Sequence, residues 1–136
     1  MITVREYMTK DPVCVAETDS LLTVCHRMEG DKFRHMPIVN EARQVVGMLS
    51  ERDLRNLRAA LDILREGIES EHGQLAVGEI MSRHVVSTTA DTSLAQAARE
   101  MNAHRIGALP VVEDDALIGI VTYTDVLKAF IDLQGA

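Results

Sequence analysis

The chain has 136 residues, 46% of them apolar and 26% charged, a composition typical of a globular protein that forms one compact domain or two small ones. A formal net charge of −7, with two Tyr, two Phe and no Trp, argues against broad nucleic-acid binding, which requires a basic surface and aromatic stacking. The apolar core must therefore be built from aliphatic residues.

The beginning of the chain, MITVREYMTK, carries charged residues and lacks the apolar segment of a signal peptide. No run of about 18 apolar residues occurs in the sequence, so we predict no membrane-spanning helix. Cys14 and Cys25 lie among apolar residues, in neither a CxxC nor a metal-ligand spacing, and we expect both to be buried as small hydrophobic side chains. These features favour a cytoplasmic location.

The first half of the chain predicts a short opening segment (VREYM), a small strand (VCV), a helix, two strands and a second helix. The first helix begins after Asp19 and Ser20, whose side chains can accept hydrogen bonds from the free N–H groups of a first turn. The strands MPIV and VVGML are joined by the polar link NEARQ, as in a hairpin. The apolar positions of the first helix recur at i, i+3, i+4 and i+7, and these are Leu21, Val24, Cys25 and Met28.

The second helix follows Ser50 and leads into a stripe of apolar residues at spacings of 3 and 4. Two interpretations of this stripe stay open. Its far end either packs on its own domain or is a solvated linker around ESEHG, or else it makes a contact with a subunit or partner. The residues of the stripe are Leu54, Leu57, Leu61, Leu64 and Ile68.

The second half of the chain repeats the first at an offset of 73 residues, which becomes 72 after one residue is lost from the hairpin link. Val4 aligns with Val77, and the phrase GMLSERD, residues 47–53, aligns with GIVTYTD, residues 119–125. The second repeat has its own small strand (VVST), its own hairpin (LPVV and LIGIV) and its own helix. That helix starts after Asp91, Thr92 and Ser93 and carries the stripe Leu94, Ala97, Ala98 and Met101.

These elements predict an α/β (α+β) fold in which the order β-α-β-β-α occurs twice. Residues 1–73 form the first repeat, with an extended helix and linker, and residues 74–136 form the second. Neither half carries enough apolar surface to be stable alone. We therefore expect the two repeats to pack together with pseudo-twofold symmetry.

Two stretches, RHMPIVNEARQVVGMLSERDL and RIGALPVVEDDALIGIVTYTDVLKAF, resemble CBS domains, and the tandem pair resembles a Bateman module. The resemblance implies a regulatory module, not an enzyme. Modules of this family dimerise into a flat disc and bind AMP, ADP, ATP or S-adenosylmethionine in clefts between the repeats. It therefore implies a homodimer that binds an adenosyl ligand and signals to an unidentified regulated protein. The acidic net charge and the lack of a long apolar run predict no nucleic-acid partner and no membrane partner.

The repeated phrase places a hydroxyl and a carboxylate where a strand ends and a helix begins. A hydroxyl there can donate to a phosphate oxygen, and a carboxylate one turn later can accept from two ribose hydroxyls. The same spacing also forms a capping box, which needs no ligand, and the residues alone leave both interpretations open. The family resemblance favours ligand binding in at least one repeat. The candidate residues are Ser50 and Asp53 in the first repeat and Thr122, Thr124 and Asp125 in the second.

Basic residues gather around the first copy of the phrase. They suit a polyanion in an otherwise acidic protein, although a solvated basic edge explains them equally well. The second repeat has Gly107 and Ala108 where the first has Arg34 and His35, so the two sites are predicted to be unequal. The candidate cations are Lys32, Arg34, His35 and Arg52 in the first repeat and Arg105 in the second.

The five histidines show neither HxH nor helix-face spacing, so we predict no metal site. No Ser-His-Asp, Cys-His or P-loop arrangement is visible, and the pair Asp114–Asp115 belongs to a turn. The sequence therefore predicts a sensor of an adenine nucleotide or S-adenosylmethionine, with no catalytic residue and no resident cofactor. The alternative is a homodimeric interaction module that binds no ligand.

Overall fold

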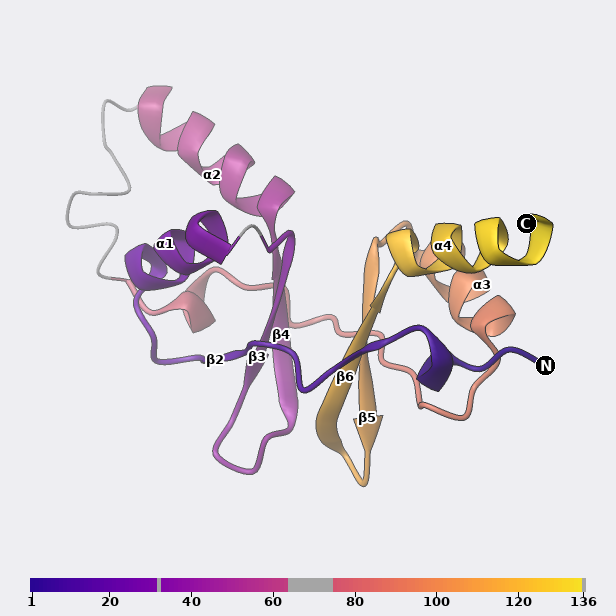
Figure 1. Ribbon diagram of the computed structural model, residues 1–136. Helices are drawn as coiled ribbons and strands as arrows, with labels where there is room; N and C mark the ends of the chain where they lie inside the picture. Colours follow the sequence, from indigo (N-terminus) through magenta and orange to yellow (C-terminus); the bar gives the residue numbers. More distant parts are fainter. Residues whose placement is uncertain (32, 64–74, 136) are drawn as a thin grey trace. The chain divides into compact units, whose positions relative to one another are not determined.

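The computed structural model describes residues 1–31, 33–63 and 75–135. The chain divides into two compact units (Figure 1). The central unit is Val13–Val85, and the terminal unit combines both ends of the chain, Met1–Pro12 and Val86–Ala136.

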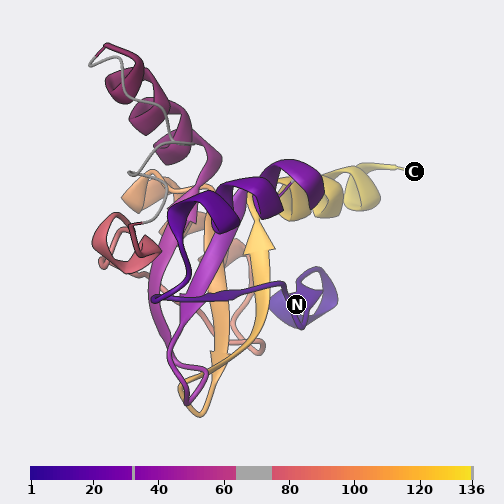
Figure 2. The same cartoon turned by 90° about the vertical axis from the view of Figure 1, so that its left-hand side faces the viewer.

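The central unit contains the predicted order β-α-β-β-α, which the structure confirms for the first repeat. Its sheet has the order β2-β3-β4, with β2 parallel to β3 and β3 antiparallel to β4. Figures 1 and 2 show α1 lying over one face of this sheet, with α2 leaving the end of β4 on the same side. The elements are β2 (Val15–Ala16), α1 (Leu21–Asp31), β3 (His35–Val39), β4 (Val45–Ser50), α2 (Glu51–Ile63) and the 3-10 helix η3 (Val77–Glu79).

The terminal unit repeats this arrangement with two differences. The strand predicted at VVST is reduced to a single parallel bridge between Thr88 and Val111. A short strand that was not predicted, β1, pairs antiparallel with β6 and gives the sheet order β1-β6-β5. The elements are η1 (Val4–Glu6), β1 (Thr9–Lys10), α3 (Leu94–His104), β5 (Ala108–Glu113), β6 (Ala116–Thr122) and α4 (Tyr123–Gln134).

Each opening segment packs with the body of the other repeat. Val4 is fully buried in the core of the terminal unit, and its N–H donates to the carbonyl of Thr92 at 2.9 Å. Val77 is fully buried in the core of the central unit, and its N–H donates to the carbonyl of Asp19 at 2.8 Å. The two compact units therefore do not coincide with the two repeats of the sequence, which are residues 1–73 and 74–136.

The glycine of the repeated phrase makes room for these opening segments. A Cβ on Gly47 would collide with the side chain of Met81. A Cβ on Gly119 would lie 2.7 Å from the sulfur of Met8 and 3.0 Å from the carbonyl oxygen of Thr9. The close backbone approach that a glycine permits is thus used by another segment of the same chain.

The predicted helix starts and the hairpin turn have the expected local geometry. Ser20 Oγ accepts from the N–H of Thr23 at 3.2 Å, and Ser93 Oγ accepts from the N–H of Gln96 at 3.0 Å, so both serines cap their helices. Asp114 and Asp115 have φ values of 50° and 65°, as a two-residue hairpin of the I′ type requires.

The predicted apolar stripes lie in the two cores. In α1, all four stripe residues are buried, while in α3 Leu94, Ala97 and Met101 are buried and Ala98 is half-buried. Cys25 is buried as expected, but Cys14, which directly precedes β2, is only half-buried. No helix among the described residues is long and apolar enough to span a membrane.

The stripe that begins in α2 can be followed only in part. Leu54 is buried in the central core, and Leu57 packs against it. Leu64 and Ile68 lie outside the described residues, as does the side chain of Leu61. The choice between a subunit contact and packing on the same domain therefore stays open for this stripe.

Candidate functional site

Two strand-to-helix corners carry the predicted site residues. The central corner joins β4 to α2 at Ser50 and Glu51, and the terminal corner joins β6 to α4 at Thr122 and Tyr123. Both helices start directly from the last residue of a strand, so the free N–H groups of each first turn lie at the end of a sheet. Such a position suits an anion only if the local side chains leave it accessible.

At the central corner, Ser50 and Asp53 bind each other reciprocally. The N–H of Ser50 donates to Asp53 Oδ2 at 3.1 Å, and the N–H of Asp53 donates to Ser50 Oγ at 3.0 Å. This is the capping arrangement that the spacing allowed. Both hydrogen bonds are local, so the cap forms whether or not a ligand is bound.

At the terminal corner, Thr122 and Asp125 also form a capping box. The N–H of Thr122 donates to Asp125 Oδ2 at 2.8 Å, and the Thr122 hydroxyl donates to the same oxygen at 3.2 Å. The hydroxyls of Thr122 and Thr124 lie 2.6 Å apart. Within the described part of the chain, the other oxygen of Asp125, Oδ1, accepts no hydrogen bond, so the cap occupies only half of the carboxylate.

The residues that precede each hairpin lie beside these corners. The N–H of Glu51 donates to the carbonyl of Arg34 at 2.8 Å, and His35 pairs with Ser50 in the β3–β4 ladder. The structure therefore brings Arg34 and His35 together with the Ser50–Asp53 cap, as their place before the MPIV strand implied.

The terminal unit reproduces this geometry without the charges. The N–H of Tyr123 donates to the carbonyl of Gly107 at 3.1 Å, and Ala108 pairs with Thr122. The two corners thus share a backbone design, while Arg34 and His35 supply a cation and an imidazole that Gly107 and Ala108 lack.

Among the described residues, the remaining predicted cations form no such backbone hydrogen bond to a strand-to-helix corner. Arg52 is exposed in the first turn of α2. Arg105 is exposed at the C-terminal cap of α3, where its φ of 55° ends the helix, and its side chain lines a pocket described below. Lys32 lies outside the described residues.

His35 is the one site residue whose pKa is clearly shifted among those the structure describes. Its partial burial lowers the pKa below the ordinary value of 6.5, and neighbouring Arg34 lowers it further. Asp53 and Glu51 oppose both effects. The imidazole is therefore neutral near pH 7, and an anion placed beside it would favour its protonation.

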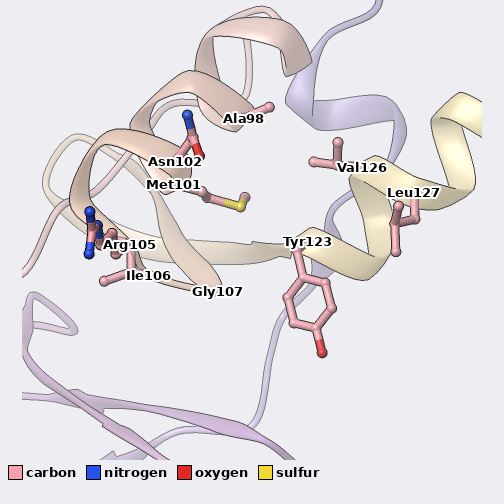
Figure 3. A pocket seen from close by; sticks show the side chains of 9 residues that line it. All are labelled: Ala98, Met101, Asn102, Arg105, Ile106, Gly107, Tyr123, Val126 and Leu127. Carbon is pink, nitrogen blue, oxygen red and sulfur yellow. The ribbon is translucent and has the colours of Figure 1, made fainter.

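A pocket of about 430 Å³ lies between α3 and α4 of the terminal unit (Figure 3). Met101 and Val126 point toward each other across it, and Arg105 and Leu127 stand at opposite rims. Sequence reasoning missed this pocket except for Arg105 and Gly107. The sequence did contain a signal for an apolar surface here. The spacing of Tyr123, Leu127 and Phe130 places a second apolar face on a helix whose other face is buried. The lining residues are Ala98, Met101, Asn102, Arg105, Ile106, Gly107, Tyr123, Val126 and Leu127.

Among the described residues, no group of three or more His, Cys, Asp or Glu side chains is placed to hold a metal ion. The two capped corners lie at the ends of two sheets of similar topology.

Comparison with known proteins identifies the family. The CBS domain model matches residues 4–60 and 77–132, which together cover most of the chain. The chain belongs to the CBS-domain family, and it holds a tandem pair of these domains. The repeat and the resemblance found in the sequence are thereby confirmed.

The chain is 33% identical over 131 residues to the protein MJ1225 of Methanocaldococcus jannaschii. This match covers 93% of the chain but only 46% of MJ1225, so the chain spans about half the length of that relative.

Two solved structures show the same fold with ligands. The structure of CBSX2 in complex with AMP superposes with a TM-score of 0.83 at 27% identity, covering 98% of this chain and 99% of that one. The CBS domain pair of protein MJ0100, in complex with 5′-methylthioadenosine and S-adenosyl-L-methionine, superposes with a TM-score of 0.78 at 25% identity, covering 95% and 99%.

Proposed function

We propose that this protein is a non-catalytic, cytoplasmic regulatory module that binds AMP, ADP, ATP or S-adenosylmethionine and signals its presence to a partner protein. The observation that carries the proposal is the half-used carboxylate at the terminal corner. Asp125 Oδ2 caps α4, while Oδ1 accepts no hydrogen bond from the described residues and remains available to a ribose. The adenosyl ligands of the similar structures support this class of ligand.

The two corners are proposed to contribute differently. At the terminal corner, Asp125 accepts from ribose hydroxyls, and the hydroxyl of Thr124 donates to the sugar or to a phosphate. The hydroxyl of Thr122 does the same by turning away from Asp125 Oδ2, while the backbone N–H of Thr122 keeps the cap. A carboxylate is well suited to this role, because its two oxygens can accept from two vicinal hydroxyls, as in dinucleotide-binding folds.

At the central corner, Asp53 takes the same ribose role, and the basic residues beside it bind phosphate. Arg34 and Arg52 provide permanent charge, and His35 provides a donor that gains charge when an anion approaches. The first turn of α2 adds backbone N–H groups. Lys32, which lies outside the described residues, and Arg105 are the other two cations proposed to bind the nucleotide.

Signalling follows from differential affinity. A ligand that binds one conformation of the module more tightly shifts the population toward it, and the shift can be no larger than the difference in binding free energy. We propose that the module acts as a homodimer, so that the shift alters the surface presented to an unidentified regulated protein.

A thermal-shift screen with AMP, ADP, ATP and S-adenosylmethionine at millimolar concentration tests the proposal. A ligand present at about 100 times its Kd stabilises the folded state by about 2.7 kcal/mol, which raises Tm by several degrees. The double variant Asp53→Asn/Asp125→Asn serves as the matched control. It keeps an oxygen for each helix cap but removes both negative charges from the proposed ribose sites.

An increase in Tm that disappears in the double variant supports adenosyl binding at the corners. An unchanged Tm with all four ligands would overturn the proposal and favour the alternative function, an interaction module that binds no ligand. An increase that persists in the double variant would place the ligand elsewhere and refute the corner assignment.

A further inference from the structure

The pocket between α3 and α4 of the terminal unit combines an apolar interior with one cation (Figure 3). Its volume of about 430 Å³ lies in the range of pockets that hold small molecules. Met101, which is buried, and Val126, which packs against the terminal core, form apolar walls. Of the lining residues that the structure describes, Arg105 alone is charged. A hollow of this kind suits a ligand that has an apolar body and a single negative charge.

The internal repeat shows how the same fold can fill this space. At the repeat offsets of 73 residues before the hairpin link and 72 after it, Ile106 corresponds to Phe33 and Val126 to Leu54. Both central residues have the larger side chain. Leu54 is buried in the central core, and Phe33 packs against that core. The terminal unit thus has smaller side chains at two positions where the central unit places larger ones.

The two units also differ in how their helices are joined. In the central unit, Arg58 of α2 forms an ion pair with Glu29 of α1 at 2.9 Å, which ties the two helices together. The corresponding residues of the terminal unit are Phe130 and Asn102, which cannot form an ion pair. Asn102 lines the pocket instead, and its amide adds a donor and an acceptor there.

The position of Arg105 determines the charge that the ligand can carry. Arg105 is the C-terminal cap of α3, and its side chain is exposed at the pocket rim. Within the part of the chain that the structure describes, its guanidinium forms neither an ion pair nor a side-chain hydrogen bond. A guanidinium binds a carboxylate through two parallel hydrogen bonds. Because the C-terminal end of a helix carries partial negative charge, one cation at this place favours a monoanion over a phosphate dianion.

We infer that this pocket binds a small monocarboxylate with an apolar body, such as a branched-chain or aryl carboxylic acid. The apolar body lies between Met101 and Val126. The carboxylate stays at the rim beside Arg105, where water reaches it, because burying it without partners costs free energy. The inference goes beyond the nucleotide sites proposed above, since neither Asp53 nor Asp125 lines the pocket.

An NMR titration of the whole isotope-labelled chain with phenylpropanoate tests the inference, with phenylpropanamide as the uncharged counterpart. We expect the amide signals of Gly107, Val126 and Leu127 to shift. We expect the carboxylate to bind about tenfold more tightly than the amide, the effect of one hydrogen bond to a charged group. Unshifted signals at these residues with millimolar phenylpropanoate would overturn the site.

A substitution of Arg105 tests its role in recognising the carboxylate. Arg105→Gln leaves the apolar hollow in place, and we expect it to reduce the affinity for phenylpropanoate to that for phenylpropanamide. Arg99→Gln removes an exposed arginine of the same helix that does not line the pocket, and it should preserve the tenfold preference. A preference for the carboxylate that survives Arg105→Gln would refute the monocarboxylate assignment.

A double variant tests whether the hollow itself holds the ligand. Ile106→Phe/Val126→Leu gives the terminal unit the larger side chains of the central unit and is expected to abolish the binding of both probes. Circular dichroism verifies the fold of this variant, and the Arg105→Gln comparison does not depend on it. Undiminished binding by the folded double variant would overturn the pocket as the site.

The outcomes separate this inference from the nucleotide proposal. Ile106→Phe/Val126→Leu keeps Arg105 and both corners, so the rise in Tm with an adenosyl ligand should persist while the binding of phenylpropanoate is lost. A Tm unchanged by all four adenosyl ligands would overturn the nucleotide proposal, whereas shifts at Gly107 and Val126 would still support the carboxylate site. An apparent affinity for phenylpropanoate that falls as the protein concentration rises would show that a second copy of the chain fills the pocket, and would overturn the inference.

Discussion

The N–H of Thr122 donates a 2.8 Å hydrogen bond to Asp125 Oδ2, so the carboxylate proposed to bind ribose also caps α4. Ser50 and Asp53 repeat this relationship in the central unit, where the corresponding distance is 3.1 Å. The sequence left the cap and the ligand site as competing explanations. The structure shows the cap and shows that it uses one carboxylate oxygen, which makes the two roles compatible.

Two substitutions of Asp125 separate these roles. Asp125→Asn keeps an oxygen that can accept from the N–H of Thr122, so we expect a nearly unchanged Tm and a loss of affinity for the adenosyl ligand. Asp125→Ala removes the cap as well and is expected to cost about 1 kcal/mol of stability in addition. Calorimetric titration and urea unfolding measure the two effects. Full affinity in the Asn variant would refute the ribose role.

Arg34→Ala tests the phosphate role of the central corner. We expect the variant to weaken ATP more than adenosine, because only the phosphates interact with the guanidinium, and to reduce the salt dependence of ATP binding. Arg99→Ala, an exposed arginine of α3, is the control. Equal weakening of ATP and adenosine by Arg34→Ala would indicate a structural effect instead.

His35 predicts how stability depends on pH. Burial and Arg34 lower its pKa below 6.5, so the unfolded chain binds this proton more readily than the folded protein does. The histidine therefore contributes stability above its unfolded pKa, and that contribution is lost as the pH falls below 6.5 toward the folded pKa. Urea midpoints measured across this range should decline less in His35→Gln than in the wild type. An equal decline in His35→Gln and in the wild type would contradict this account of His35.

The two glycines of the repeated phrase are expected to differ in tolerance. In Gly119→Ala the new methyl group meets the Thr9 carbonyl, which belongs to the backbone of β1 and cannot easily move. In Gly47→Ala the obstacle is the side chain of Met81, which can adopt another rotamer. We expect a loss of roughly 1–3 kcal/mol for Gly119→Ala and a smaller one for Gly47→Ala, measured by urea unfolding. A larger loss of stability for Gly47→Ala than for Gly119→Ala would contradict the idea that the rigid backbone of β1 limits what position 119 can accept.

Substitutions of Val4 and Val77 test whether each opening segment packs with the body of the other repeat. Val4→Ala removes buried methyl groups from the terminal core and is expected to cost roughly 1–3 kcal/mol. The lost amide protection should appear in β5 and β6, although the mutated residue lies in the first repeat. Val77→Ala should instead affect β3 and β4. Hydrogen exchange measures the protection of both sheets. A loss of protection in β3 and β4 caused by Val4→Ala would contradict the packing of the first opening segment with the second repeat.

Local features of the fold could be predicted from the sequence because their causes lie within a few residues. Helical periodicity predicted the stripes of α1 and α3, and Ser20 and Ser93 were expected as caps because a hydroxyl needs only the N–H three residues later. The gathering of Arg34 and His35 at the central corner followed from their position before a strand that pairs back onto β4.

Other features depend on which segments meet in space. The sequence alone determined that the chain consists of two similar repeats, with a hydroxyl and a carboxylate at each corner. Only the tertiary structure decided that Val4 packs with the second repeat and Val77 with the first, and that the repeated glycines accommodate Met8 and Met81. It also decided that Phe130 faces outward while Ala129 faces the core. The pattern along the chain shows that a segment must be buried, whereas the segment that buries it is selected by complementary shape between residues far apart in sequence.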